Sequence, residues 1–172
     1  MWVRSHRTGY SPLYFGRSGQ NRFDAPGAVF GVLYVAADAH GAFIETFGRQ
    51  LGRLIVSMAE LADRELSEVR PARPLRLVDM SGAGLARIGA DARVMSGRYD
   101  ISQPWSLALH NHPDQPDGLL YRSRHDPSRL CTALFDRVAP VLSTESLGSF
   151  ADPRNAALLG DVLDRYGYGL IA

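Results

Sequence analysis

The chain has 172 residues, of which 45% are hydrophobic and 22% charged, and this composition predicts one ordinary globular domain with a core of its own. The formal net charge of +1 argues against a general binder of nucleic acid or membrane surfaces, because such proteins carry a basic excess. The single cysteine excludes an internal disulfide and fits a reducing compartment. With no long apolar run and a polar start, a cytoplasmic protein without a membrane span is expected.

The basic residues are unusual in kind, since all 19 are arginine. This excludes a lysine Schiff base and the lysine of a phosphate-binding P-loop. A GC-rich genome is sufficient to explain the bias. Every fixed cation is nevertheless a planar fork that suits phosphate or carboxylate.

The first third of the chain predicts two strands and a helix. Residues 1–6 form a short strand, and a Gly-, Ser- and Pro-rich loop follows over residues 8–21. Residues 28–37 are rich in aromatic and β-branched side chains and predict a second strand. Asp38 is then expected to cap a helix that runs to about residue 52. Its apolar positions recur at helical spacing, at Ala39, Phe43, Phe47 and Leu51.

The middle of the chain is less regular. Ser57 and Glu60 form a capping box that predicts a second helix starting near Met58. Residues 75–80 read as a strand, and residues 105–110 read as a helical turn before a polar loop.

The last part predicts a strand over residues 132–137, then a helix and a closing strand. Asp152 and Pro153 fit as N-cap and first residue of the helix, Gly167 fits as its end, and residues 168–171 read as a strand. Strands outnumber helices without regular alternation, so the fold class is α+β. A single domain over residues 1–172 is expected.

Three motifs fail as functional signatures. The glycines of residues 82–84 tempt a dinucleotide-binding assignment, but the third glycine of that fingerprint is replaced by Arg87. His110 and His112 lack a third ligand at metal-site spacing, so no metal is expected. Ser123 precedes a His-Asp pair, but the glycines of a nucleophile elbow do not surround it.

The first predicted helix carries an unusual face. At 100° per residue, one side gathers Asp38, Gly41, Glu45, Gly48 and Gly52. A glycine inside a helix costs up to about 1 kcal/mol relative to alanine. Either a ligand or another backbone approaches this face closely, or the face is solvated and its glycines are incidental.

Several residues occur together in an order that is similar to one known family. They are Arg4 in the first strand, Arg22 in "NRFD", Tyr34 in "GVLYVA", Glu45 in "AFIETFGR", and Tyr121 and Ser123 in "DGLLYRSRHDP". Over about residues 3 to 140 the chain resembles the RES-domain family, bacterial toxins encoded beside Xre-type antitoxins. Each motif is weak alone, and the ordered set is more specific.

The resemblance implies a fold related to ADP-ribosyltransferases, with a split β core flanked by helices. It implies an activity on NAD⁺ and no metal. The nicotinamide–ribose bond is cleaved by phosphorolysis or hydrolysis, with inorganic phosphate as co-substrate in the first case. Alternatively, ADP-ribose is transferred to a target protein. It also implies an Xre-type helix-turn-helix antitoxin as partner, with no direct contact to nucleic acid or membrane.

The resemblance gives each matching residue a role. Arg4 and Arg22 would hold the pyrophosphate or an incoming phosphate through charge-assisted bonds. Tyr34 and Tyr121 would pack on the nicotinamide, and Ser123 would hydrogen-bond a phosphate or the ribose. Glu45 is expected to carry the chemistry, because its carboxylate can stabilise positive charge that develops on the ribose.

Two questions stay open at this point. The residues do not choose between phosphate, water and a protein side chain as acceptor, or between Arg4 and Arg22 as the more important cation. An arginine-rich module that only binds an acidic partner is a further alternative, and turnover of NAD⁺ by pure protein would exclude it.

Overall fold

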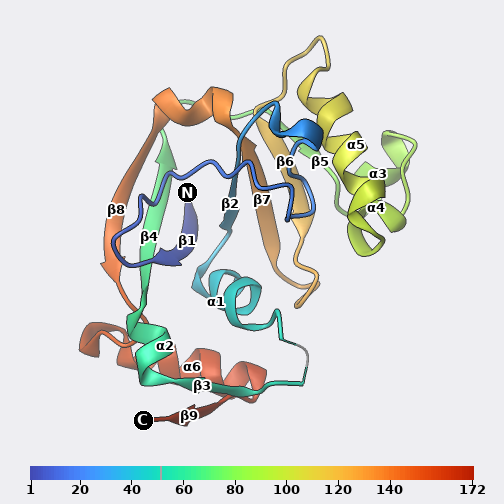
Figure 1. Cartoon of the computed structure of the whole chain (residues 1–172). Helices are drawn as coiled ribbons and strands as arrows, with labels where there is room; N and C mark the ends of the chain where they lie inside the picture. The colour runs from blue at the N-terminus through green and yellow to red at the C-terminus, as the bar shows by residue number, and fades with distance from the viewer. Residues whose placement is uncertain (51) are drawn as a thin grey trace.

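A seven-stranded mixed sheet forms the centre of the computed structural model, which describes residues 1–50 and 52–172 (Figure 1). The strand order is β5-β6-β7-β2-β1-β4-β8, and only β5 and β6 run parallel. The strands are β1 (Trp2–Arg7), β2 (Val32–Ala36), β4 (Arg64–Pro71), β5 (Leu77–Asp79), β6 (Gly118–Arg122), β7 (Leu130–Phe135) and β8 (Leu142–Gly148).

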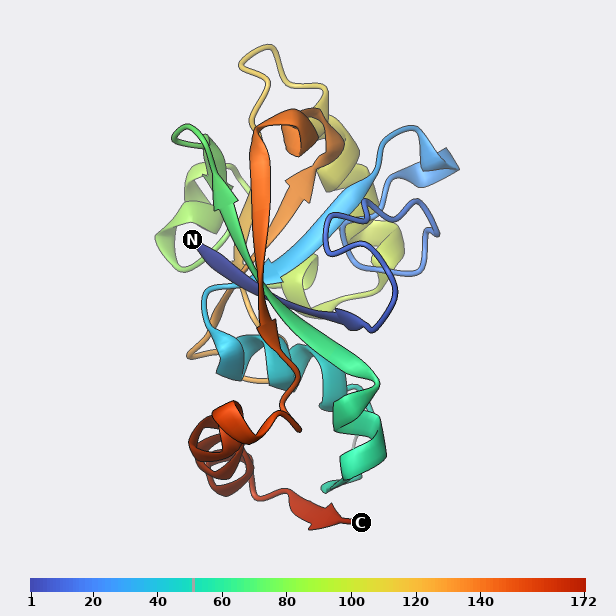
Figure 2. The same cartoon turned by 90° about the vertical axis from the view of Figure 1, so that its left-hand side faces the viewer.

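The sheet is split between β1 and β2. β1 pairs with β4 from Trp2 to Arg7, but its antiparallel register with β2 consists of one pair, Val3 with Ala36. The strands therefore meet at one point and then diverge, as the side view shows (Figure 2). The predicted split β core is thus present, and the polar groups on the diverging stretches of β1 and β2 need other partners.

Within residues 1–50 and 52–172, six α-helices and a small second sheet surround this core. The helices are α1 (Ala39–Phe47), α2 (Met58–Ala62), α3 (Ala83–Arg87), α4 (Arg93–Ser96), α5 (Tyr99–His110) and α6 (Ala156–Tyr166). β3 (Ile55–Ser57) and β9 (Gly169–Ile171) pair in parallel beneath α1, beside α2 and α6 (Figure 1). Short 3₁₀ turns cover Pro26–Ala28, Asp136–Val141 and Pro153–Asn155. None of the helices in the described ranges is long and apolar enough to cross a membrane.

The helix ends follow the sequence signals. The Asp38 carboxylate accepts a hydrogen bond from the Gly41 amide, so it caps α1 as predicted, although α1 ends at Phe47 rather than near residue 52. Both hydrogen bonds of the predicted capping box open α2. Gly167 adopts the left-handed conformation that ends α6. The predicted apolar position Leu51 lies outside the described residues.

Several elements depart from the prediction. No element was expected over β3, α3 or α4. β4 and β8 were not expected either: β4 is rich in charged residues, and β8 is an exposed edge strand of mostly polar residues. Helix α5 starts six residues earlier than the predicted turn at Trp105 and contains Pro104. The hydroxyls of Ser102 and Ser106 bond the carbonyl oxygens of Arg22 and Phe23, so tertiary contacts hold this helix.

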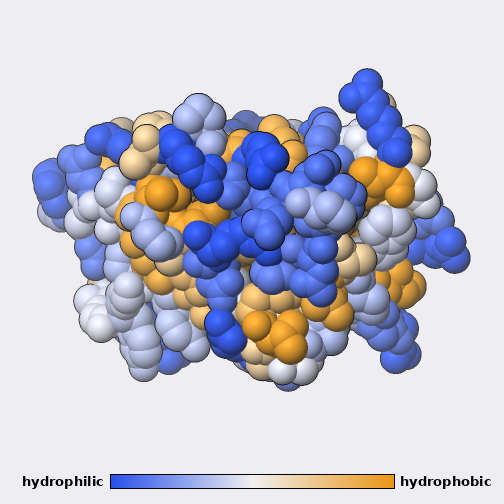
Figure 3. Space-filling view, turned by 90° about the horizontal axis from the view of Figure 1, so that it is seen from above, coloured by the Kyte–Doolittle hydropathy of each residue, from blue (hydrophilic) through white to orange (hydrophobic). Residues whose placement is uncertain are grey.

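Both faces of the sheet are covered. The larger core cluster packs between the sheet and the helices, and Phe43 of α1 lies against the rings of Phe150 and Tyr168. On the opposite face, Leu33 and Val35 of β2 belong to a second, smaller cluster. On the surface seen from above, hydrophobic patches are separated by hydrophilic side chains (Figure 3).

Residues after position 151 belong to the same core. Leu159 and Val162 of α6, together with Tyr168, are part of the larger cluster. His40 of α1 contacts Asp161 of α6 at 2.7 Å. The C-terminal helix therefore braces α1, the helix that follows β2.

The buried face of β6 gives a first prediction. Leu119 is fully buried in the larger cluster, whereas Leu54 is 52% exposed. Leu119→Ala should lower the free energy of unfolding by about 2–5 kcal/mol, because it leaves a cavity in the core. Leu54→Ala should change it by only about 0.5 kcal/mol. Denaturant unfolding measures both, and equal losses would contradict the placement of β6.

Candidate functional site

A cleft with a volume of about 280 Å³ opens where β1 and β2 diverge. Its walls come from β1, β2, α1, the segments around α4 and α5, and the end of β6. Every residue predicted for the site except Ser123 lines it: Arg4, Arg22, Tyr34, Glu45 and Tyr121. Residues that lie far apart in the sequence thus converge on one concave surface.

Glu45 supplies the carboxylate of this cleft. It stands on α1, which is anchored by the buried side chains of Ala42, Phe43 and Ile44. One oxygen, Oε1, is buried and has no hydrogen-bond partner among the described residues. Burying a carboxylate oxygen without a partner is costly, so such an atom is more typical of a ligand site than of a structural contact.

Arg22 supplies a fixed cation to the same cleft. Its Nη1 donates to the carbonyl oxygens of Val94 and Gly97, at 3.2 and 2.9 Å, and its guanidinium lies 5.2 Å from the ring centroid of Tyr99. Its Nη2 is buried and has no acceptor within the described ranges. Burial lowers the pKa of Arg22. The side chain is therefore held rigidly while one donor remains for a ligand.

Tyr34 positions the segment that carries Arg22. Its hydroxyl accepts from the Phe23 amide at 2.9 Å and donates to Oδ1 of Asp24 at 3.0 Å. Burial raises the pKa of this phenol, and the nearby Asp24 carboxylate raises it further, so the hydroxyl stays neutral. The ring still lines the cleft, but its polar end is already engaged.

Arg4 connects the cleft to the loop after β1. Its Nη1 donates to the carbonyl oxygens of Pro12 and Tyr14, at 2.8 and 3.1 Å. Burial lowers its pKa to about 10, so the guanidinium remains charged at neutral pH. Arg4 therefore both orders the loop and contributes positive charge to the cleft.

Ser123 is not brought into the cleft. It is 2% exposed, and its hydroxyl accepts hydrogen bonds from the amides of His125 and Asp126, both at 3.1 Å. Because β6 ends at Arg122, the alternation expected beyond it stops. Arg122 and Arg124 line the cleft together with Tyr121, which the alternation of a regular strand would not produce. Ser123 shapes the turn rather than presenting a free hydroxyl.

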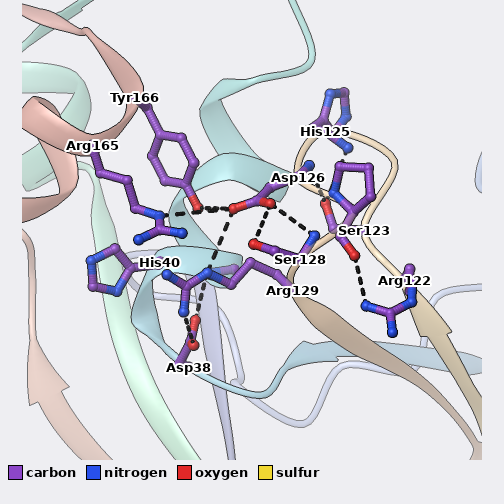
Figure 4. A network of polar contacts seen from close by, with 12 residues as sticks. Asp38, His40, Arg122, Ser123, His125, Asp126, Ser128, Arg129, Arg165 and Tyr166 are labelled. Carbon is purple, nitrogen blue, oxygen red and sulfur yellow. Dashed lines mark hydrogen bonds and ion pairs between the residues drawn. The ribbon is translucent and has the colours of Figure 1, made fainter.

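A polar network locks this turn against two helices (Figure 4). Asp126 accepts from the Tyr166 hydroxyl of α6 at 2.8 Å, and its Oδ2 lies 3.5 Å from Nε of Arg129. Arg129 in turn contacts Asp38, the N-cap of α1, at 2.5 Å. The helix that carries Glu45 and the turn after β6 therefore share one set of contacts.

The glycine face of α1 serves this packing. A Cβ atom at Gly41 would lie 3.0 Å from that of Ala36 and 3.7 Å from that of Arg129. A Cβ atom at Gly48 would lie 3.3 Å from Cγ of His125. Side chains of neighbouring segments therefore approach this face at Gly41 and Gly48, whereas no atom lies within 4 Å of a Cβ atom at Gly52.

His125 is a cleft residue that the sequence analysis missed. It lines the cleft, and burial lowers its pKa while the charge of Glu45 acts in the opposite direction. Its position two residues after Ser123 gave no signal, because strand alternation does not extend past Arg122. A neutral imidazole therefore stands on the same side as the carboxylate.

The arginines divide by location. Ten of them have a carboxylate within 4.0 Å, and among these only Arg7 lines a cleft. The cleft-lining arginines without such a partner in the described ranges are Arg4, Arg22, Arg49, Arg64, Arg122 and Arg124. Unpaired positive charge is thus concentrated where a ligand can enter, which favours an anion.

The thiol of Cys131 also lines the cleft. Burial raises the pKa of Cys131, so it is a neutral thiol rather than a nucleophile. Among the described residues, no group of three or more His, Cys, Asp or Glu side chains is arranged to hold a metal ion.

Comparison with known proteins gives three similarities. Residues 1–151 match the RES domain family. The probable toxin y4kH of Sinorhizobium fredii is 32% identical over 122 residues, which cover 70% of this chain and 93% of the relative. A chain of the M. tuberculosis MbcT–MbcA toxin–antitoxin complex superposes with a TM-score of 0.66 at 14% identity, over 95% of this chain and 88% of that one. This last match shows a shared fold, and the α+β class is confirmed.

Ser123 yields a stability prediction. Ser123→Ala should lower the free energy of unfolding by about 1–3 kcal/mol, because two amides lose their buried acceptor. Ser143→Ala, on the exposed strand β8, should have a much smaller effect. Denaturant unfolding tests both variants. If the Ser123→Ala protein were as stable as the wild type, the structural role of this hydroxyl would be contradicted and a ligand-binding role would be the better explanation.

His125 yields a pH prediction. Because its pKa is lowered in the folded state, the unfolded state takes up the proton first, and stability falls as the pH drops below about 6.5. His125→Gln should therefore lose less stability than the wild type between about pH 7 and pH 5. Urea unfolding at several pH values measures the difference. If the free energy of unfolding fell equally with pH in both proteins, the prediction would be contradicted.

Proposed function

This chain belongs to the RES-domain family, and from that premise we propose that it is the toxin of a toxin–antitoxin pair and cleaves the nicotinamide–ribose bond of NAD⁺. One observation carries the proposal. The cleft contains a buried carboxylate oxygen of Glu45 and a buried Nη2 of Arg22, and neither has a partner among the described residues. A ligand that bears both hydroxyls and phosphates satisfies both atoms, and a dinucleotide is such a ligand.

The carboxylate suits the chemistry of this bond. When the bond breaks, its electron pair moves to the pyridinium nitrogen, which becomes neutral nicotinamide, and positive charge develops on the ribose. Glu45 stabilises that charge and accepts hydrogen bonds from ribose hydroxyls. The leaving group needs no proton, so the carboxylate can remain ionised throughout.

The other cleft residues bind and orient the substrate in this proposal. Tyr121 is 7% exposed and forms part of the wall beside Glu45, which suits an aromatic contact with nicotinamide. Arg22 holds a phosphate through its remaining donor. Tyr34 and Ser123 act indirectly, because their hydroxyls do not bind the substrate in this proposal. They hold in place the segments that carry Arg22 and His125.

The acceptor of the ribosyl group is inorganic phosphate, water or a protein side chain. The unpaired arginines of the cleft favour phosphate, which arrives already ionised and needs no base. With water as acceptor, His125 of the cleft is suited to take the proton, since burial lowers its pKa and keeps it neutral. Transfer of ADP-ribose to a protein side chain is the second candidate function. It begins with the same cleavage of the nicotinamide–ribose bond.

The partner is proposed to be an antitoxin. The structural match is a chain of a toxin–antitoxin complex, and the curated relative is described as a probable toxin. An Xre-type helix-turn-helix protein is the expected class, with the pair acting in the cytoplasm. Co-purification of the two proteins from a co-expressing strain tests this partnership.

Chromatography of NAD⁺ incubated with pure protein tests the reaction. The wild type should release nicotinamide, and Glu45→Gln should reduce the rate by about 10²–10³-fold, because it removes the charge but keeps the shape. Glu145→Gln, which removes an exposed carboxylate on β8, should be fully active. Unchanged NAD⁺ with every protein, in buffer with and without phosphate, would exclude simple degradation.

The products identify the acceptor. Phosphorolysis gives a phosphorylated ADP-ribose only when phosphate is present, and hydrolysis gives ADP-ribose in both buffers. If nicotinamide is released only after a cell lysate is added, labelled NAD⁺ should mark a lysate protein. If NAD⁺ stays intact and no lysate protein is labelled, a non-enzymatic binding module is the better explanation.

A further inference from the structure

A second chamber, with a volume of about 380 Å³, adjoins the cleft that holds Glu45. The two share part of their walls: Arg4, Ser5, Asn21, Tyr34, Thr46 and Arg49 line both. The second chamber extends from this common wall toward the end of β1 and the start of β4, where Arg7 and Arg64 stand. A ligand seated at Glu45 can therefore continue into it past Arg4.

The two chambers differ in chemistry. The first combines a carboxylate with aromatic side chains, namely Glu45 with Tyr99 and Tyr121. The second has no aspartate or glutamate among its described lining residues. Most of its polar groups are arginines and hydroxyls, and the imidazole of His6 and the amide of Asn21 line it as well. Donors of this kind, without competing carboxylates, suit an anion with several oxygen atoms.

The arginines of this chamber are not neutralised by the protein. Within the described ranges, Arg49 and Arg64 have no carboxylate within 4.0 Å, although ion pairs are common elsewhere on the surface. Arg7 reaches Asp63 at 3.7 Å, but both side chains are 63% exposed, so this pair is weak. Arg64 is half-buried, and burial lowers its pKa, as do the charges of Arg7 and Arg49, while the charge of Asp63 acts in the opposite direction. Like charges gathered in one concave site are relieved by a bound anion.

A buried hydroxyl adds an independent sign of a ligand. Oγ of Ser5, on the wall that the chambers share, is buried and lacks a hydrogen-bond partner among the described residues. Its strand pairs with β4 on one side, while the side toward β2 diverges after Val3. A buried hydroxyl without a partner is typical of a site that a ligand completes.

We propose that this second chamber is a phosphate-binding subsite in which Arg64 and Arg49 hold a phosphate group next to the reacting bond. The inference rests on the proposed function for the identity of the main ligand. The phosphate is either part of the dinucleotide or free inorganic phosphate, and both offer the same oxygen atoms to the arginines.

Titration calorimetry on the full chain tests the proposal through binding alone. The probes are ADP-ribose, which carries the pyrophosphate but not the scissile bond, and inorganic phosphate. Arg64→Gln removes one charge from the second chamber only, and Arg87→Gln removes one charge from an exposed helix outside both. The dissociation constant of the probe that occupies the subsite should rise about 10- to 100-fold in Arg64→Gln and stay unchanged in Arg87→Gln.

The pattern of binding separates the two sources of phosphate. A loss confined to ADP-ribose assigns the subsite to the dinucleotide, and a loss for inorganic phosphate assigns it to the free ion. If wild-type protein binds phosphate but not ADP-ribose, and Arg64→Gln abolishes this, the subsite stands while the proposed activity on NAD⁺ fails. Equal affinities of wild type and Arg64→Gln for both probes, or no binding of either by the wild type, would overturn the subsite.

Discussion

The pairing of β1 with β2 at a single position, Val3 with Ala36, is the constraint on which the rest of the structure depends. One further pair of ladder hydrogen bonds would close the sheet and leave no room between the strands. Because the strands diverge instead, Arg4 of β1 and Tyr34 of β2 both line a cleft. The chain then enters α1 directly after the point of contact, which places Glu45 on the floor of the same opening.

Keeping the split open costs stability, and the chain offsets that cost around the cleft. Arg4 and Tyr34 each use part of their hydrogen-bonding capacity to order the loop between β1 and β2. Asp126 and Arg129 fasten the turn after β6 to the helices on either side (Figure 4). What remains unsatisfied is concentrated at the cleft: buried polar atoms without partners and arginines without carboxylates. That distribution is expected where a ligand, rather than the fold, completes the contacts.

The sequence specified local features better than it specified the sheet. Asp38, Ser57 and Gly167 sit at helix ends as expected, because capping depends on a few neighbouring residues. β4 and β8 escaped prediction, since their polar side chains are accommodated by pairing between strands distant in sequence. The site residues were found through family resemblance, yet their roles needed the fold. No periodicity could reveal that the hydroxyl of Ser123 is consumed by its own turn.

In the proposed complex, NAD⁺ lies across the split with its nicotinamide–ribose bond beside residue 45. A crystal structure of the Glu45→Gln variant with saturating NAD⁺ tests it most directly, because the variant keeps the shape of the cleft and turns over slowly. The account predicts an intact dinucleotide with its ribose next to residue 45 and a phosphate within reach of Arg22. NAD⁺ bound elsewhere, or an empty cleft at saturation, would contradict it.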